Sequence, residues 1–219
     1  MKLYEDEEKK ELRKMAEYYK ESHKLLTNHE WMEKVVVRTF LRICGVKFKD
    51  DDLKKGSEPP DVVFREANFE VTEVQDEGRR RGDENRERID RNENVKCLSD
   101  LFEPYISPSS MDFSQLIKNV ERGMDIKHRK KKYQNPETCK NLDLLVYVDL
   151  NKRYLALETK IDCSSEFLSK VRKQGWRSVS FLMGLCAGVI FADEHMPDLF
   201  KKLQVVIKTT DNPDIYKDR

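Results

Sequence analysis

The stretch that decides the fold is Pro59-Pro60-Asp61-Val62-Val63-Phe64-Arg65-Glu66-Ala67-Asn68-Phe69-Glu70-Val71-Thr72-Glu73-Val74-Gln75. Two short runs rich in Val and Phe flank a polar connection that contains Asn68, and this pattern predicts a β-hairpin. Asp61 opens the first predicted strand, and Glu70 lies on the second strand, on the same face as Thr72. A carboxylate among Val and Phe is costly to bury unless it is paired or bound to a metal. The hairpin is therefore the first indication of chemistry.

Asp61 and Glu70 on neighbouring strands offer oxygen ligands to a hard divalent cation such as Mg²⁺ or Mn²⁺. Such a metal would activate water and offset charge on a phosphoryl oxygen. The layout resembles the PD-(D/E)xK nuclease superfamily, whose motif is Pro-Asp, a variable gap, then Asp/Glu-x-Lys. Pro60-Asp61 and Glu70-Val71-Thr72 fit this motif except at the last place. The resemblance implies a metal held by Asp61, Glu70 and the Val71 carbonyl.

Further blocks narrow the resemblance. They are Glu58-Pro59-Pro60-Asp61-Val62, Phe69-Glu70-Val71, Asp76-Glu77-Gly78-Arg79-Arg80 and Gln174-Gly175-Trp176-Arg177-Ser178. Together they are similar to a family of uncharacterised bacterial proteins described as endonucleases with a restriction-endonuclease-like fold. The likeness covers residues 28 to 205, and it implies hydrolysis of phosphodiester bonds in nucleic acid, with DNA as the expected polymer.

The motif lysine, which in the superfamily orients water or stabilises the pentavalent phosphate, is replaced here by the uncharged Thr72. Other superfamily members use Glu-x-Gln, and Glu73-Val74-Gln75 offers that pattern three residues later. This second register puts its acid on the opposite face from Glu70, so we prefer Glu70. Either Thr72 or Gln75 would then position the attacking water.

The positive charge that is missing at the motif has several candidate sources. Three arginines, Arg79, Arg80 and Arg81, follow the hairpin, and a guanidinium can grip phosphate with two donors. We expect Arg79 or Arg80 to stabilise transition-state charge. The whole segment from residue 76 to 91 otherwise favours an exposed helix crossed by ion pairs.

A rival constellation lies in a second predicted hairpin, formed by residues 141–150 and 154–161. Asp149, Glu158 and Lys160 satisfy the Asp…Glu-x-Lys pattern literally. This site ranks second because Asp149 ends its strand beside a tight turn. Lys160 could instead reach the first site as a displaced lysine.

Charge limits how nucleic acid could be recognised. Lys and Arg number 42 against 41 Asp and Glu, so attraction must come from local patches. The most basic local patch lies at the C-terminal end of a helix predicted over residues 110–133. Tyr133, in this patch, could stack on a base. The expected nucleic-acid-binding residues are Arg79, Arg80, Arg81, Lys127, Arg129, Lys130, Lys131 and Lys132.

Other features bear on compartment. Five scattered cysteines without CxxC spacing predict free thiols in a reducing cytosol. The N-terminus is acidic, and no apolar run approaches the roughly 20 residues that span a bilayer. We therefore expect a soluble, cytoplasmic protein without a membrane partner.

The order of elements predicts an α/β fold: a restriction-endonuclease-like mixed central sheet flanked by helices, with an N-terminal helical extension. Residues 1–27 form a charged helix, residues 28–208 the nuclease-like domain and residues 209–219 a tail. Asn28 is predicted to cap a second helix that ends at Ile43, and Ser164 or Ser165 a later one. Two alternatives remain open. One is a nuclease-fold protein without catalysis that binds nucleic acid or a protein, and the other is a homodimer built through the first helix.

Overall fold

The computed structural model describes residues 2–94, 107–156, 163–201, 203 and 208–209. The chain divides into two compact units. The first comprises Met1–Met32 with Glu77–Ser107, and the second comprises Glu33–Asp76 with Pro108–Arg219. The first unit thus includes the arginine-rich segment, which the sequence predicts to be part of the nuclease-like domain.

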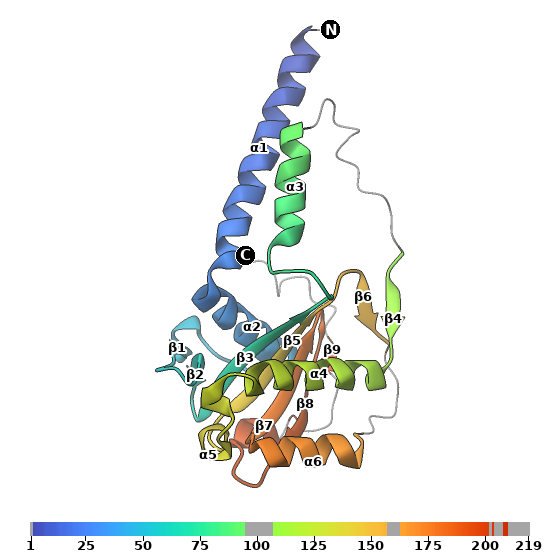
Figure 1. Ribbon diagram of the computed structural model, residues 1–219. Helices are drawn as coiled ribbons and strands as arrows, with labels where there is room; N and C mark the ends of the chain where they lie inside the picture. Colours follow the sequence, from blue (N-terminus) through green and yellow to red (C-terminus); the bar gives the residue numbers. More distant parts are fainter. Residues whose placement is uncertain (1, 95–106, 157–162, 202, 204–207, 210–219) are drawn as a thin grey trace. The chain divides into compact units, whose positions relative to one another are not determined.

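The first unit is built on two charged helices, α1 (Lys2–Thr27) and α3 (Asp83–Asn94), that pack against each other (Figure 1). The ammonium of Lys20 lies 2.8 Å from the carboxylate of Glu93, and the guanidinium of Arg88 lies 5.5 Å from the ring centroid of Tyr19. The predicted long N-terminal helix is confirmed. In the described part of the chain, every helix is too short or too polar to cross a membrane.

Helix α2 (His29–Ile43) has the predicted cap, since the Asn28 side chain accepts a hydrogen bond of 3.1 Å from the Trp31 amide. Gly45 follows its end with φ +72°, a left-handed conformation that glycine adopts without steric cost. From Glu33 onward this helix belongs to the second unit.

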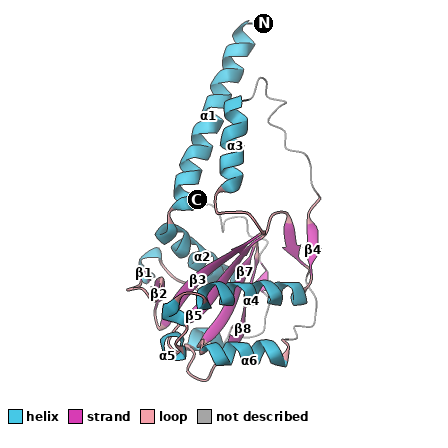
Figure 2. Cartoon of the chain, viewed as in Figure 1, coloured by secondary structure: helices cyan, strands magenta, loops and turns pink. Residues whose placement is uncertain are grey.

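The second unit is organised on a seven-stranded mixed sheet of order β1-β2-β3-β5-β7-β8-β9 (Figure 2). The strands are β1 (Leu53–Lys55), β2 (Val62–Phe64), β3 (Ala67–Gln75), β5 (Asp143–Asp149), β7 (Ser178–Met183), β8 (Cys186–Ala192) and β9 (Lys208–Thr209). The three central strands, β3, β5 and β7, run parallel, and their neighbours on either side pair antiparallel. Parallel neighbours require crossover connections, and here the crossovers carry helices that include α4 (Phe113–His128) and α6 (Ser165–Gln174). The predicted mixed central sheet flanked by helices is confirmed.

Helices cover the two faces of this sheet differently. Helices α4 (Phe113–His128) and α6 (Ser165–Gln174) lie over one face, as Figure 1 shows. The largest apolar cluster lies beneath them and includes Leu116, Val120, Val146, Phe167 and Phe181. On the other face, the ring of Phe69 packs against those of Phe40 from α2 and Phe200 from α7 (Asp198–Lys201). Odd-numbered and even-numbered side chains of β3 therefore meet different helices.

The first predicted hairpin is confirmed, although its turn falls at Arg65-Glu66, where Arg65 has φ +53°, and Asn68 lies inside β3. The second predicted hairpin is wrong. β5 pairs with β3 and β7, while β6 (Arg153–Leu155) pairs with β4 (Ser109–Met111) in a separate two-stranded sheet. Apolar residues on both faces of β5 make it a central strand with a neighbour on each side. β6, the next strand in the chain, is therefore not a pairing partner of β5.

Two further boundaries differ from the sequence expectation. The helix predicted over residues 110–133 begins after its capping residue Asp112 and ends at His128; a separate 3₁₀ turn, Lys131–Tyr133, follows. The helix predicted from residue 164 is α6, capped by the Ser164 hydroxyl, which accepts a hydrogen bond of 3.1 Å from the Phe167 amide.

Candidate functional site

Asp61 is fixed by a tight loop that closes just before β2. The Gly56 amide donates to the Asp61 carbonyl over 2.9 Å, and the Asp61 amide donates to the Phe69 carbonyl over 3.0 Å. A Cβ on Gly56 would lie 1.8 Å from the Pro60 carbonyl oxygen, so only glycine fits there. The Asp61 Oδ2 atom accepts a hydrogen bond of 2.7 Å from the Val71 amide. The carboxylate is thus tied to β3, where Glu70 lies.

Glu70 is fully buried, with an exposed fraction of 0%. Its Oε1 atom accepts hydrogen bonds from the Lys127 ammonium and from the Tyr133 hydroxyl. Its Oε2 atom is also buried and has no hydrogen-bond partner among the described residues. Burial raises the pKa of the Glu70 carboxyl, and the charge of Lys127 opposes that rise. The two donors leave one carboxylate oxygen available for a further partner.

Lys127 brings the positive charge to the two acids. Its ammonium lies 3.4 Å from Asp61 Oδ2 as well as beside Glu70, and its exposed fraction is 5%. The residue lies in the last turn of α4, on the same helix face as Gly123 one turn earlier. The sequence predicts Lys127 in a basic surface patch. Its buried position between Asp61 and Glu70 has no signal in local sequence spacing, because the contacts span 66 and 57 residues.

Thr72, at the place of the motif lysine, faces α4 instead of a cleft. A Cβ on Gly123 would lie 3.1 Å from Cγ2 of Thr72 and 2.7 Å from Cγ1 of Val146, which shows how closely the helix approaches the sheet here. A lysine at position 72 would meet the backbone of α4. Helix α4, which leaves no room for a lysine at position 72, supplies Lys127 one turn after Gly123.

Tyr133 holds Glu70 from the other side. Its ring centroid lies 5.9 Å from that of Trp176, and its exposed fraction is 0%. Burial, and then the hydrogen bond to Glu70, raise the pKa of the Tyr133 phenol, so it stays a donor at neutral pH. The neighbouring Cys139 donates to the Tyr133 carbonyl over 3.6 Å, and burial raises the pKa of that thiol to about 11. The expectation that Tyr133 stacks on a base is wrong, because the ring is enclosed.

The block of residues 174–178 supports this arrangement. Gly175 ends α6 with φ +79°, and a Cβ there would lie 2.7 Å from the Pro136 carbonyl oxygen. The Trp176 indole donates to Gln174 Oε1 over 3.0 Å, which fixes the ring that packs against Tyr133. The first half of the block therefore orients the donor to Glu70.

Arg177 and Ser178, the second half of the block, anchor the hairpin. The Arg177 guanidinium donates to both oxygens of Asp143, and also to the Glu66 carbonyl over 3.1 Å. Asp143 accepts two more hydrogen bonds, from the Asn68 amide (2.8 Å) and the Ser178 hydroxyl (2.9 Å). Burial raises the pKa of the Asp143 carboxyl against the opposing effect of Arg177. Because Asp143 is in register with Phe69, this network lies one residue along β3 from Glu70.

A family model for "Putative endonuclease, protein of unknown function (DUF1780)" matches residues 7–212. The chain belongs to this family. Among curated proteins, none matches it. One solved structure that resembles this chain is a protein of unknown function from Pseudomonas aeruginosa strain PAO1, described as a member of the monooxygenase superfamily. It is 23% identical, with a TM-score of 0.64 over 95% of this chain and 98% of that one. At this identity the likeness shows a shared mixed α/β fold.

Other sequence-predicted residues of this DUF1780 member lie away from the acids. Glu73 accepts a hydrogen bond of 3.0 Å from Gln75, and both lie on the face of β3 opposite Glu70. Asp149 is in register with Gln75, at the far end of the shared strands from Glu70. Glu158 and Lys160 lie outside the described residues.

The three arginines belong to the first unit. Arg79 lies 3.6 Å from Glu84 and 3.8 Å from Glu87, and the Arg81 guanidinium lies 3.3 Å from His29 Nδ1. The Arg80 amide donates to Asp83, the first residue of α3. Their expected phosphate contact stays a prediction.

A metal would find only part of its ligands here. Among the described residues, no group of three or more His, Cys, Asp and Glu side chains could hold an ion. The carboxylates of Asp61 and Glu70 are nevertheless hard oxygen donors, and Oε2 of Glu70 has no hydrogen-bond partner among the described residues. Mg²⁺ is commonly held by one or two carboxylates together with water and substrate phosphate. The donor set fits a cation that takes its remaining ligands from water and from substrate phosphate.

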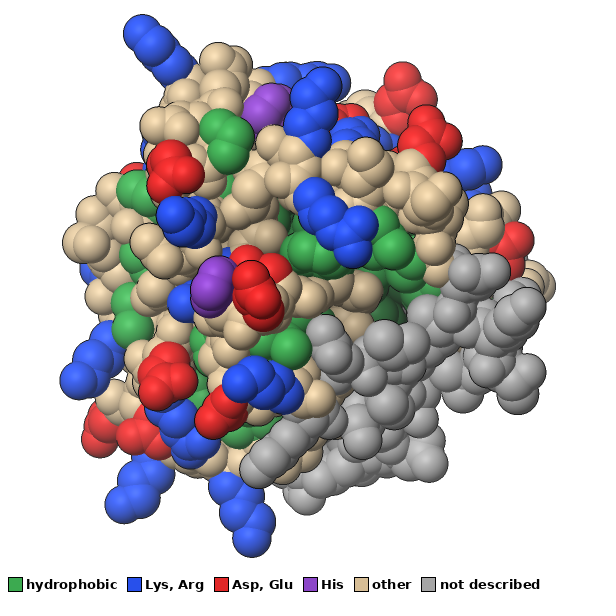
Figure 3. Space-filling model, turned by 90° about the horizontal axis from the view of Figure 1, so that it is seen from below, with side chains coloured by type: hydrophobic (Ala, Val, Ile, Leu, Met, Phe, Trp, Pro, Cys, Tyr) green, Lys and Arg blue, Asp and Glu red, His purple; other side chains and the backbone are tan. Residues whose placement is uncertain are grey.

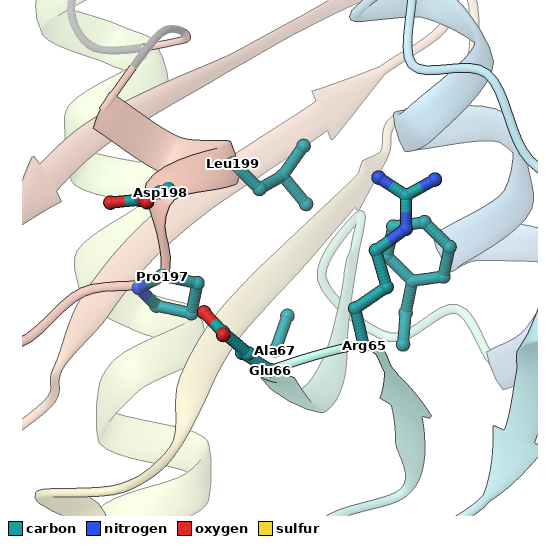
Figure 4. Close-up of a pocket in the computed structure, with 7 residues that line it drawn as sticks. Arg65, Glu66, Ala67, Pro197, Asp198 and Leu199 are labelled. Carbon is teal, nitrogen blue, oxygen red and sulfur yellow. The ribbon is translucent and has the colours of Figure 1, made fainter.

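A cavity of about 350 Å³ lies elsewhere in the second unit, between the turn that joins β2 to β3 and the start of α7 (Figure 4). Its lining residues are Phe64, Arg65, Glu66, Ala67, Pro197, Asp198 and Leu199. The site residues Asp61, Glu70, Lys127 and Tyr133 are not among them. On the face drawn in Figure 3, basic and acidic side chains are interspersed.

Proposed function

We propose that the protein is a divalent-metal-dependent nuclease that hydrolyses phosphodiester bonds, with DNA as its expected polymer. Asp61, Glu70 and the Val71 carbonyl would hold Mg²⁺ or Mn²⁺. Lys127 would take the role of the lysine that the motif lacks at Thr72. The observation that carries this proposal is the Lys127 ammonium between Asp61 Oδ2 and Glu70 Oε1.

The chemistry of the three side chains supports the assignment. A PD-(D/E)xK site needs two acids from adjacent strands and one ammonium near them. In the motif, a lysine supplies this ammonium from the position that Thr72 occupies here. Here α4 delivers an equivalent charge from the same side of the sheet, because Gly123 lets the helix approach Thr72. We also propose that the fold is restriction-endonuclease-like, and the mixed sheet with parallel central strands is compatible with such a fold.

Each residue has a distinct task in this scheme. Lys127 donates to a phosphate oxygen and orients the attacking water. Tyr133 holds Oε1 of Glu70, so Oε2, which has no hydrogen-bond partner among the described residues, is the oxygen that would hold the metal. The bound cation would lower the pKa of a water molecule and offset charge on the phosphoryl group. Asp61 keeps its orientation through the Val71 amide.

The test measures hydrolysis of plasmid, single-stranded DNA and RNA with Mg²⁺ or Mn²⁺ by the full chain. We expect Asp61→Asn, Glu70→Gln and Lys127→Met each to lower the rate by on the order of a hundredfold or more, as for loss of a group that stabilises transition-state charge. Asp125→Asn is a matched control, since Asp125 lies on α4 but pairs with Lys170. Circular dichroism establishes that each variant is folded.

Metal binding gives a second measurement that does not depend on turnover. Calorimetric titration with Mn²⁺ should show one site that Asp61→Asn and Glu70→Gln both abolish. Hydrolysis that survives in Asp61→Asn and Glu70→Gln would defeat the assignment. Loss of activity in Glu73→Gln alone would transfer the site to the second register.

A second function, a nuclease-fold module that binds nucleic acid or a protein without catalysis, is favoured by two observations. The Lys127 ammonium already balances charge at the place where a cation would bind, and Glu70 is fully buried. Salt-sensitive binding of nucleic acid, with no Mn²⁺ site by calorimetry, would support this module over the enzyme.

A further inference from the structure

The basic segment that follows α4 is attached to the acid site at both of its ends. Lys127, in the last turn of α4, donates to Glu70 Oε1, and Tyr133 donates to the same oxygen. Between them lies the basic strip, which we define as Arg129, Lys130, Lys131 and Lys132. Four residues span at most about 14 Å of extended chain, so the strip cannot lie far from Glu70.

The strip faces solvent, whereas both of its anchors are buried. All four side chains are exposed. The Lys132 ammonium lies 4.8 Å above the Tyr133 ring and 3.7 Å from the carboxylate of Glu58, three residues before Asp61. The strip therefore borders the loop that positions Asp61, and it places four positive charges beside a pair of recessed acids.

We propose that the basic strip binds the phosphate backbone of a nucleic-acid strand and holds it at the Asp61–Glu70 site. This inference rests on the proposed function for the identity of the polymer. Phosphate contacts by Lys and Arg release counterions and position a strand without reading its sequence. Glu58 competes with phosphate for Lys132, so the strip carries one built-in opposing charge.

The experiment measures binding of a fluorescent single-stranded oligonucleotide of mixed sequence to the full chain, in EDTA, over a range of salt concentrations. The test variant is Lys130→Gln with Lys131→Gln, which avoids Lys132 and its contact with the Tyr133 ring. The control is Lys47→Gln with Lys201→Gln, which removes the same charge from two exposed positions. Lys201 follows Phe200, whose ring packs on the face of β3 opposite Glu70.

We expect the strip variant to lose affinity and to lower the slope of log K against log salt by about 1.4, from two lost single-strand phosphate contacts. The control should keep the slope of the unaltered protein. Glu58→Gln should bind more tightly than the unaltered protein. Equal slopes for strip variant and unaltered protein, an equal loss in the control, or no binding by the unaltered protein would each overturn the inference.

Hydrolysis with Mn²⁺, measured separately, distinguishes the two proposals. If the unaltered protein binds the oligonucleotide through the strip but does not hydrolyse it, the inference about the strip stands and the nuclease assignment fails. Hydrolysis by the strip variant at an unchanged rate and with unchanged salt dependence would do the reverse.

Discussion

At the scale of single residues, the site depends on one ammonium that faces two carboxylates in a place almost closed to water. Burial raises the pKa of the Glu70 carboxyl, and the ammonium of Lys127 opposes that rise. Removing one partner of a buried ion pair is strongly destabilising, because it leaves an uncompensated charge in the interior. Lys127 is therefore a stability determinant whatever its role in chemistry.

We predict that Lys127→Met destabilises the protein by roughly 3 to 5 kcal/mol, because it leaves Asp61 and Glu70 buried without a cation. Chemical denaturation followed by circular dichroism measures this change. Adding Glu70→Gln should recover part of the loss, since residues in one network are not additive. Lys140→Met, which breaks only an exposed ion pair with Glu137, should cost about 0.5 kcal/mol or less. An equal cost for Lys127→Met and Lys140→Met would contradict this account.

At the scale of elements, helix α4 determines which residue meets the acids. Its approach to β3 and β5 depends on Gly123, which lies against Thr72 and Val146. The helix axis is thereby held close enough for Lys127, one turn later, to reach Glu70. The position of the ammonium is set by helix packing instead of by the strand that carries the motif.

Gly123→Ala tests this packing through the sign of its effect. At an open helical position the change would stabilise by about 1 kcal/mol. Here the new methyl group would lie 2.7 Å from Val146 Cγ1, so we predict destabilisation of roughly 1 to 3 kcal/mol. Ser114→Ala, at an exposed position of the same helix, serves as the control for helix propensity. Val146→Ala should reduce the cost of Gly123→Ala when both are present, and a stabilised Gly123→Ala would refute the close contact.

Local signals in the sequence predicted the elements well. Asn28 and Ser164 both cap helices as expected, and the Pro-Pro-Asp start with alternating Val and Phe does mark the first hairpin. The failures concern contacts between distant residues. The prediction that β5 pairs with the next strand in the chain is wrong, because nothing in the residues of β5 identifies β3 and β7 as its partners.

The same limit applies to the site. The approach of Asp61 and Glu70 follows from a hairpin and was predictable. Lys127 lies 57 residues from Glu70, and its basic surroundings favoured a surface position. Tyr133 likewise gave no signal for a buried hydroxyl. An expectation based on spacing could not find either residue, since helix packing brings them in.

At the scale of the whole molecule, the acids, Lys127, Tyr133 and the basic strip all come from the second unit. The site is recessed, with Asp61 only 9% exposed and Glu70 not at all, whereas the strip is open to solvent. A phosphodiester must leave the surface to reach the acids. A flexible single strand can do so one linkage at a time, but a paired duplex must first unstack or unpair.

We therefore predict that hydrolysis of a single-stranded oligonucleotide is faster than hydrolysis of the same sequence in a duplex. The measurement is the initial rate with Mn²⁺ for both substrates at equal concentration of scissile linkages. A duplex carrying an unpaired flap should be cut in the flap. Faster cutting of the intact duplex would show that the acids are reached by another route.

The two donors that meet on one oxygen of Glu70 also close a ring, made of the main chain from Lys127 to Tyr133 and the two side chains that return to the carboxylate. A ring of this kind opens completely once either closure is released. The backbone amides of this segment should therefore exchange their hydrogens with solvent as one cooperative group. A force that acts on the exposed lysines would be transmitted to the Glu70 carboxylate, which closes the ring.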